Sequence, residues 1–147
     1  MVWAGISYSG RTDLIQVQGN LTARRYLDEI IRPHVLPFMN RQNVIFQHDN
    51  ARPHTARIPR DFLAQNNVQV LDWPSRSPNL NPIEHLGDEL DRRVRQRDPQ
   101  PQTLPALFVA LRAEYQLIRR HFIRNLVQSM GHRCQATIDA NGGHTRY

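Results

Sequence analysis

Two carboxylates stand where metal-dependent chemistry could use them. Asp49 follows the apolar run Val44–Gln47, and Glu84 follows a segment rich in Pro, Ser and Asn. A side chain at a strand end is held by the strand yet can face outward. Hard cations such as Mg²⁺ prefer carboxylate oxygens, and two such ions can activate a water or a 3′-hydroxyl for attack on a phosphodiester. We therefore predict that Asp49 and Glu84 are catalytic metal ligands.

Each carboxylate also has a structural interpretation. Asp49 could cap the helix that starts near Pro53 or form an Asx-turn with Asn50. Asn81 is a good N-cap and Pro82 suits the first helical position, so Glu84 falls at the third position, where a Glu completes a capping box. The residues alone leave both interpretations open.

Three histidines flank these acids, namely His48, His54 and His85. Their spacing matches no standard zinc pattern, so we expect hydrogen bonds to substrate or local packing instead of zinc binding. The acids of residues 88–91 are followed by Arg92, Arg93 and Arg95, which predicts solvated ion pairs on a helix.

The charge balance favours a nucleic-acid partner. The net charge is +6, the pI is about 10.6, and all 19 basic residues are Arg. The planar guanidinium matches phosphate oxygens, although a solvated helix face is the alternative. The candidate DNA contacts are His54, Arg76, Arg92, Arg93, Arg119, Arg120 and Arg124.

Length, cysteine content and hydropathy restrict the class of protein. A length of 147 residues predicts one domain. Cys134 is the single cysteine, so an intrachain disulfide is excluded and a reducing compartment is expected. No apolar run approaches the roughly 20 residues of a membrane span, and no secretory signal is visible.

The first half of the chain reads as a hairpin, a helix and a βαβ unit. Strands over Val2–Tyr8 and Leu14–Gln18 flank a Ser-Gly turn. A helix with apolar residues at helical spacing follows, capped by Asn20 or Thr22 and kinked or broken by Pro33 and Pro37. A short buried strand at residues 44–47, a helix from residue 53 that Pro59 kinks or delays, and a strand at residues 68–71 then predict a parallel pair.

The second half reads as helices. The first runs from Pro82 to about Arg95. Residues 98–102 form a linker, Thr103 caps the next helix, and residues 119–134 form a basic helical segment. An apolar stripe is expected on the helix after Thr103, at Leu104, Leu107, Phe108, Leu111, Tyr115 and Ile118.

These motifs resemble a known family. Residues 2–7, 47–54 and 73–84 and the tail at 141–147 are similar to the catalytic domain of mariner/Tc-type DDE transposases, which have an RNase H-like α/β fold. The acids also agree in spacing, since 84 − 49 − 1 = 34 residues intervene. The resemblance implies that Asp49 is the second metal-binding Asp and Glu84 the final Glu. It also implies Mg²⁺ or Mn²⁺ as the cofactor, with transposon-end DNA and a TA target as partners. A homodimer is a possible assembly, and the nucleus is the implied location.

Two departures from the family pattern stand out. The family's first Asp lies on a central strand upstream of the segment that begins here at Met1, and its helix-turn-helix domains are also upstream. Asp13 lies at the hairpin turn and cannot substitute. We therefore expect residues 1–147 to be a single truncated catalytic domain with little activity. Gly87 stands where the family carries Trp, which costs helix stability of about 0.5–1 kcal/mol relative to Ala.

The missing central strand has a structural consequence. Either Met1–Tyr8 pairs directly with Val44–Gln47, or strand edges stay exposed and the chain is marginally stable. Two other functions remain open. One is a non-catalytic remnant that binds DNA or a partner protein through its arginines, including Arg95 and Arg133. The other is a two-metal nuclease of the same fold, which would need a third acid.

Overall fold

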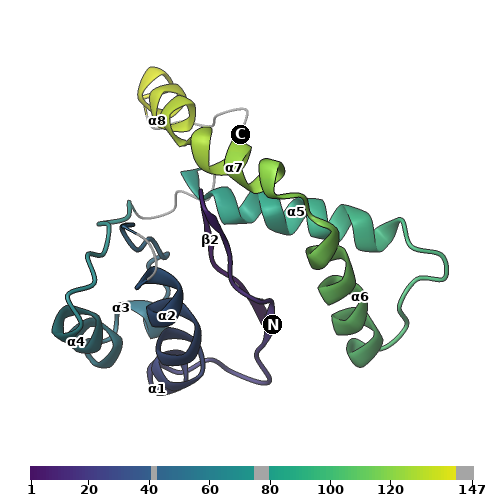
Figure 1. The fold of residues 1–147 in the computed structure, drawn as a ribbon, viewed down its shortest axis with the longest axis horizontal. Coiled ribbons are helices and arrows are strands. Elements are labelled where there is room, and N and C mark those ends of the chain that lie inside the picture. The colour runs from purple at the N-terminus through teal and green to yellow at the C-terminus, as the bar shows by residue number, and fades with distance from the viewer. Residues whose placement is uncertain (41–42, 75–79, 142–147) are drawn as a thin grey trace. The chain divides into compact units, whose positions relative to one another are not determined.

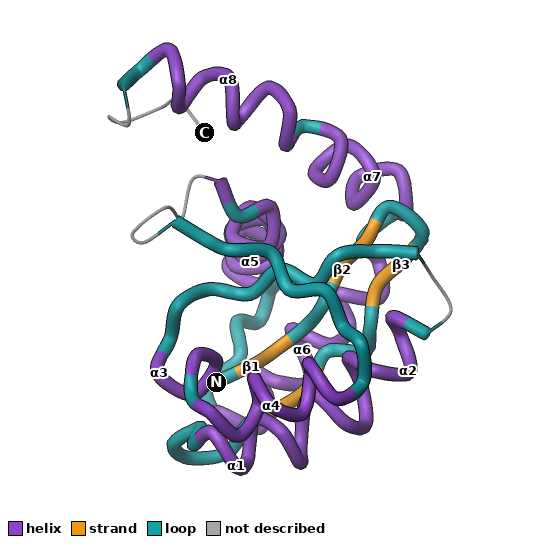
Figure 2. The backbone as a smooth tube through the Cα atoms, turned by 90° about the vertical axis from the view of Figure 1, so that its left-hand side faces the viewer, coloured by secondary structure: helices purple, strands orange, loops and turns teal. Residues whose placement is uncertain are grey.

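The computed structural model describes residues 1–40, 43–74 and 80–141 (Figure 1). The chain forms two compact units. The first comprises Met1–Gly5 and Ile15–Arg76, and the second comprises Ile6–Leu14 and Ser77–Tyr147. Strand is scarce in both, as the short orange segments of Figure 2 show.

The predicted N-terminal hairpin is confirmed, but it is built from two short antiparallel ladders. In the first unit β1 (Val2–Trp3) pairs with β4 (Ile15–Gln16). In the second unit β2 (Ile6–Ser7) pairs with β3 (Gly10–Arg11). The hydroxyl of Ser7 accepts hydrogen bonds from the backbone N–H groups of residues 9 and 10, each at 3.2 Å. A side chain therefore closes the turn that the Ser-Gly pair predicts.

A helix follows in the first unit, in three consecutive parts. They are α1 (Ala23–Arg25), the π-helical η1 (Tyr26–Val35) and α2 (Leu36–Met39). Thr22 caps it, because its hydroxyl accepts from the N–H of Arg25 at 3.3 Å. Of the kink or break predicted at Pro33 and Pro37, the break is not found: the helix passes through Pro33 with π-helical turns and continues into α2.

This helix supplies most of the core of the first unit. Tyr26, Ile30 and Ile31 are fully buried, and they pack with Val17 and Leu63. Leu63 belongs to α4 (Arg57–Gln65), which follows the short α3 (Arg52–Thr55). The chain is extended at Ala56, so α4 begins late and holds a buried Pro59 in its first turn. This agrees with the predicted late start.

The predicted parallel pair is present, but only as one bridge. Phe46 lies opposite Val70; the N–H of Phe46 donates to Gln69 O at 2.8 Å, and the N–H of Leu71 donates to Phe46 O at 2.8 Å. The prediction that residues 44–47 form a buried strand is wrong. Ile45 is 52% exposed and Leu71 is 43% exposed.

The exposure of residues 44–47 follows from how the N-terminal hairpin pairs. Its β1 strand pairs with β4, and no ladder joins residues 1–8 to residues 44–47 in the described ranges. A strand without neighbours on both sides cannot bury its faces or satisfy its backbone through a sheet. Of the two arrangements expected from the sequence, the exposed edge is therefore the one found.

The second unit is helical. It holds α5 (Pro82–Arg95), α6 (Leu104–Leu117), α7 (Arg120–Gln128) and α8 (Met130–Asp139). Helix α5 packs on α6 and α7, and α7 packs on β2 and β3. The buried side chains include Leu86, Leu90, Val94, Ala110, Tyr115, Ile118 and Ile123.

The predicted caps of this unit are confirmed. The side chain of Asn81 accepts from the N–H of Ile83 at 3.3 Å, and Thr103 accepts from the N–H of Ala106 at 3.3 Å. Leu104 is 78% exposed, so its place in the predicted apolar stripe is wrong and burial on α6 begins a turn later. None of the helices in the described ranges has the length and apolarity needed to cross a lipid bilayer.

Candidate functional site

Asp49 lies in the first unit, directly after the bridged segment and before α3. Its Oδ1 accepts the backbone N–H of Ala51 at 3.0 Å and lies 2.5 Å from Nδ1 of His54. The first contact is the local turn that the structural interpretation predicts. An ionised carboxylate can only accept, so His54 Nδ1 is the donor. The side chain is 57% exposed, and Oδ2 has no partner among the described residues.

An aromatic cluster lies behind His54. The His54 side chain is 14% exposed. Its ring centroid is 4.1 Å from that of Tyr26 and 5.3 Å from that of His48, whose ring is within 11° of parallel. Tyr26 comes from η1 and is fully buried. Three residues distant in sequence therefore form one packed support beside Asp49.

The protonation of this support follows from its burial. Burial, with a smaller contribution from His54, lowers the pKa of His48 to about 4, so His48 is neutral at pH 7. Burial raises the pKa of Tyr26, which therefore keeps its phenol proton. The Tyr26 hydroxyl and Nδ1 of His48 are hydrogen-bonded at 3.2 Å.

Glu84 lies in the second unit, on the first turn of α5. Its backbone N–H donates to the carbonyl oxygen of Asn81 at 3.2 Å, so the helix starts where the sequence predicts. Its side chain is exposed and its carboxylate has no ion pair or hydrogen bond among the described residues. A negative charge at this position is stabilised by the helix dipole. Within the described ranges no three His, Cys, Asp or Glu side chains gather as a metal-binding group.

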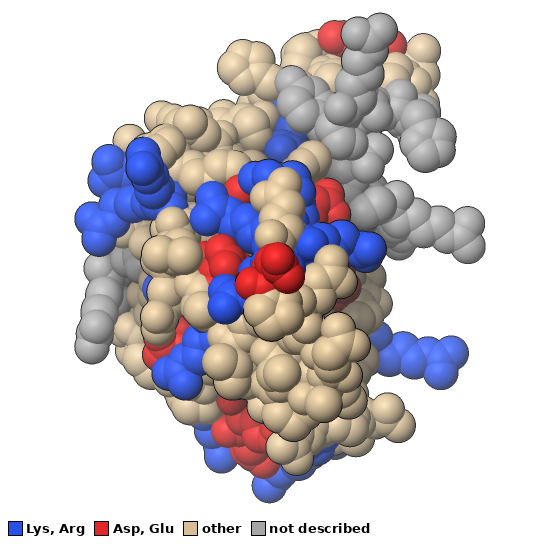
Figure 3. Space-filling model, turned by 90° about the vertical axis from the view of Figure 1, so that its right-hand side faces the viewer, with Lys and Arg blue, Asp and Glu red and all other residues tan. Residues whose placement is uncertain are grey.

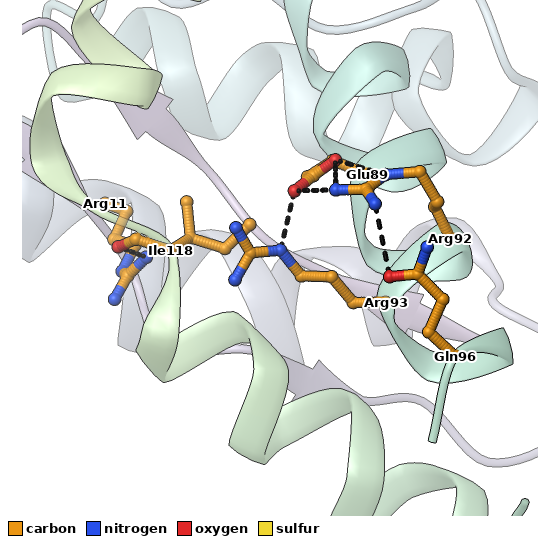
Figure 4. Close-up of polar contacts among 6 residues, drawn as sticks. All are labelled: Arg11, Glu89, Arg92, Arg93, Gln96 and Ile118. Atoms are coloured by element: carbon orange, nitrogen blue, oxygen red, sulfur yellow. Dashed lines mark hydrogen bonds and ion pairs between the residues drawn. The ribbon is translucent and has the colours of Figure 1, made fainter. Parts of the chain in front are cut away.

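The arginines of α5 have partners on the same helix, as predicted. Arg92 Nη2 lies 2.8 Å and Arg93 Nε lies 2.6 Å from the carboxylate of Glu89 (Figure 4). The hydrogen bond from Arg93 lowers the pKa of Glu89, which stays ionised. Arg95 Nε lies 2.7 Å from Asp91. On the face drawn in Figure 3, basic and acidic side chains likewise lie side by side. The charges of these arginines are therefore largely compensated.

The arginines at the start of α7 differ from those of α5 in their partners. Arg119 and Arg120 are exposed, and their side chains have no partner among the described residues. Arg124 lies over the ring of Tyr8 at 5.1 Å and donates to its carbonyl oxygen at 3.4 Å. Arg133 is buried and donates to the hydroxyl of Ser129, so it does not contribute to a basic surface. Arg76 lies outside the described residues.

Two residues that contact candidate site residues, Tyr26 and Tyr8, were not predicted from the sequence. Tyr26 reads as a core residue by its helical spacing, and nothing in the pattern links it to His48, 22 residues later. Tyr8 reads as a strand residue, and its contact with Arg124 joins positions 116 residues apart.

Comparison with known proteins identifies the family. The family model of the DDE superfamily endonucleases matches residues 1–105. The chain belongs to this family. The Tc1 transposase of Caenorhabditis elegans is 37% identical over 150 residues, which cover 100% of this chain and 54% of that protein. The Tcb1 transposase of Caenorhabditis briggsae is 34% identical over 151 residues, again 54% of its length. The chain thus spans about half the length of these relatives.

Solved structures give the same fold. The catalytic domain of Mos1 mariner transposase matches with a TM-score of 0.79 at 22% identity, over 99% of this chain and 76% of that one. A mariner Mos1 paired end complex with Mg matches with a TM-score of 0.81 at 23% identity, over 99% and 45%. The predicted RNase H-like fold and the resemblance to mariner/Tc-type DDE transposases are therefore confirmed. The chain is therefore a member of the DDE superfamily endonucleases and has the fold of the Mos1 catalytic domain.

Proposed function

We propose that Asp49 and Glu84 of this DDE-family chain ligate Mg²⁺ or Mn²⁺ for DNA cleavage and strand transfer. The observation that carries the proposal is that both motif carboxylates are exposed, with Oδ2 of Asp49 and the whole Glu84 carboxylate unpartnered in the described ranges. Carboxylate oxygens suit these hard cations. A bound cation would activate a water or 3′-hydroxyl and stabilise the leaving oxygen.

A metal titration tests the ligands. We expect Mn²⁺, followed by electron paramagnetic resonance, to bind the native chain, and Asp49→Asn and Glu84→Gln each to abolish that binding. Asp61→Asn is the matched control, because Asp61 is an equally exposed acid on α4 outside the motif. Equal binding in all four proteins would overturn the assignment.

We propose that this chain alone supports little strand transfer. Two carboxylates hold a divalent ion weakly, and the described residues offer no group of three. The assay is joining of pre-cleaved transposon ends to a TA-containing target. Mg²⁺-dependent joining that disappears in Asp49→Ala and Glu84→Ala would contradict the proposed inactivity.

The proposed partners are transposon-end DNA and a second copy of the chain, and the proposed location is the nucleus. Support for DNA comes from the related Mos1 structures, which include a paired end complex and a strand transfer complex. Sedimentation with and without transposon-end DNA tests the assembly. A monomer at all DNA concentrations would argue against the homodimer.

A second function, DNA binding without catalysis, rests on the free arginines Arg119 and Arg120. Each phosphate contact contributes about 0.9 to the slope of log affinity against log salt concentration. We expect Arg119→Ala/Arg120→Ala to reduce that slope by about 2. The charge-matched control is Arg24→Ala/Arg32→Ala, whose arginines already pair with Asp28. Equal slopes in the two double variants would remove the case for α7. DNA binding unchanged in Glu84→Ala would favour this function over catalysis.

A further inference from the structure

The arrangement around Asp49 leaves its two oxygens unequal. Oδ1 accepts from Ala51 N and from His54 Nδ1, whereas Oδ2 has no partner among the described residues. Two donors on one oxygen fix both side-chain torsions of Asp49. An exposed aspartate without such donors would sample several rotamers, and a metal would have to select one of them.

His54 is itself held in place. Its backbone N–H donates to Ala51 O at 2.8 Å within α3, which brings the residue back toward Asp49. Its ring packs against those of both Tyr26 and His48, whose centroids lie 6.1 Å from each other. Tyr26 is anchored in the core and is hydrogen-bonded to His48. The donor on Asp49 is therefore part of a packed, largely buried cluster of three rings.

We propose that His54 is a positioning residue, which donates its Nδ1 proton to Oδ1 of Asp49 and so directs Oδ2 to the divalent cation. This inference rests on the proposed function, because it requires Asp49 to be a metal ligand. It assigns His54 to Asp49 and not to DNA. Residues that orient a metal ligand in this way typically change metal affinity by 10-fold or more when they are removed.

Two substitutions separate the donor from the ring. His54→Phe keeps an aromatic ring beside Tyr26 and removes the donor. His54→Asn keeps an N–H donor at the position of Nδ1 and removes the rest of the ring. We expect Mn²⁺ affinity to fall about 10-fold in His54→Phe and to stay within about 3-fold of native in His54→Asn. Thermal unfolding of both variants checks that each is folded.

A second readout does not depend on metal. In ¹⁵N-histidine spectra of the native chain, we expect His54 to carry its proton on Nδ1, and Asp49→Asn to shift that resonance. A His54 protonated only on Nε2 would overturn the inference.

The metal results distinguish two failures. In the first case, Mn²⁺ binding depends on Asp49, but it is either equal in the native and His54→Phe chains or lost equally in His54→Phe and His54→Asn. The positioning role then fails and the proposed function stands. If Mn²⁺ binding does not depend on Asp49, the proposed function fails and the positioning role fails with it.

Discussion

Tyr115 offers a quantitative test of how the second unit is held together. The side chain lies on α6, is 3% exposed, and donates its hydroxyl to Thr12 O at 2.8 Å. The guanidinium of Arg11 lies 4.6 Å from the centroid of the Tyr115 ring and donates to the carbonyl oxygen of Gln116. It also donates to the carbonyl oxygen of Ile118 (Figure 4). These contacts fasten β3 and the turn after it to the end of α6. We propose Tyr115→Phe as the perturbation.

The magnitude follows from one hydrogen bond and one pKa. Loss of the bond to Thr12 costs about 1 kcal/mol at neutral pH. Burial raises the pKa of Tyr115 from 10.0 to about 12. Between these values the unfolded chain releases the phenol proton more readily, so stability falls as pH rises. At pH 11 the native chain has lost about 1.4 kcal/mol through this group, and Phe has nothing to lose.

The assay is urea unfolding of both proteins at pH 8 and pH 11, followed by circular dichroism. We expect the variant to be less stable than the native chain by about 1 kcal/mol at pH 8. At pH 11 the native chain has lost about 1.4 kcal/mol, so the order reverses and the variant is more stable by about 0.4 kcal/mol. Ionisation of Tyr26, whose pKa burial also raises, affects both proteins equally and cancels. A gap that stays constant from pH 8 to pH 11 would refute the reasoning.

Three further predictions concern α5 and its packing. Leu90→Ala should lower the free energy of unfolding by about 2–5 kcal/mol in urea titrations, because Leu90 is buried, whereas the exposed Leu104→Ala should change it by less than about 0.5 kcal/mol. Gly87→Ala should raise the melting temperature, with a gain of about 0.5–1 kcal/mol, because an added Cβ meets nothing within 4 Å; a lower melting temperature would contradict this. Asn81→Ala should cost about 1 kcal/mol in urea unfolding through the lost N-cap, and an unchanged midpoint would argue against that cap.

Some of the candidate site was predictable from neighbouring residues. Asn81 caps α5, Glu84 lies on its first turn, and the acids of residues 89–91 pair with arginines three or four positions away. Each feature depends on short-range geometry within one helix, which the order of residue types largely specifies. The roles of Asp49 and Glu84 as metal ligands stay predictions.

The predictions that were wrong concern features that depend on strand pairing and tertiary packing. Residues 44–47 read as a buried strand by composition, yet Ile45 is exposed because a strand's burial depends on its neighbours in a sheet. Pro33 reads as a helix breaker, yet the helix continues in π form through a stretch whose apolar side chains fill the core. Tertiary burial outweighed local preference at that position.

The sequence by itself determined the family motifs, the caps at Asn81 and Thr103, and the hairpin turn, because each is specified by residues close together in the chain. Only the tertiary structure decided which charges remain available. It buried Arg133, left Arg119 free, and placed Tyr26 against His54 beside one oxygen of Asp49. Such contacts join residues far apart in sequence, so no local pattern encodes them, and they determine which side chains stay accessible to a metal ion or to DNA.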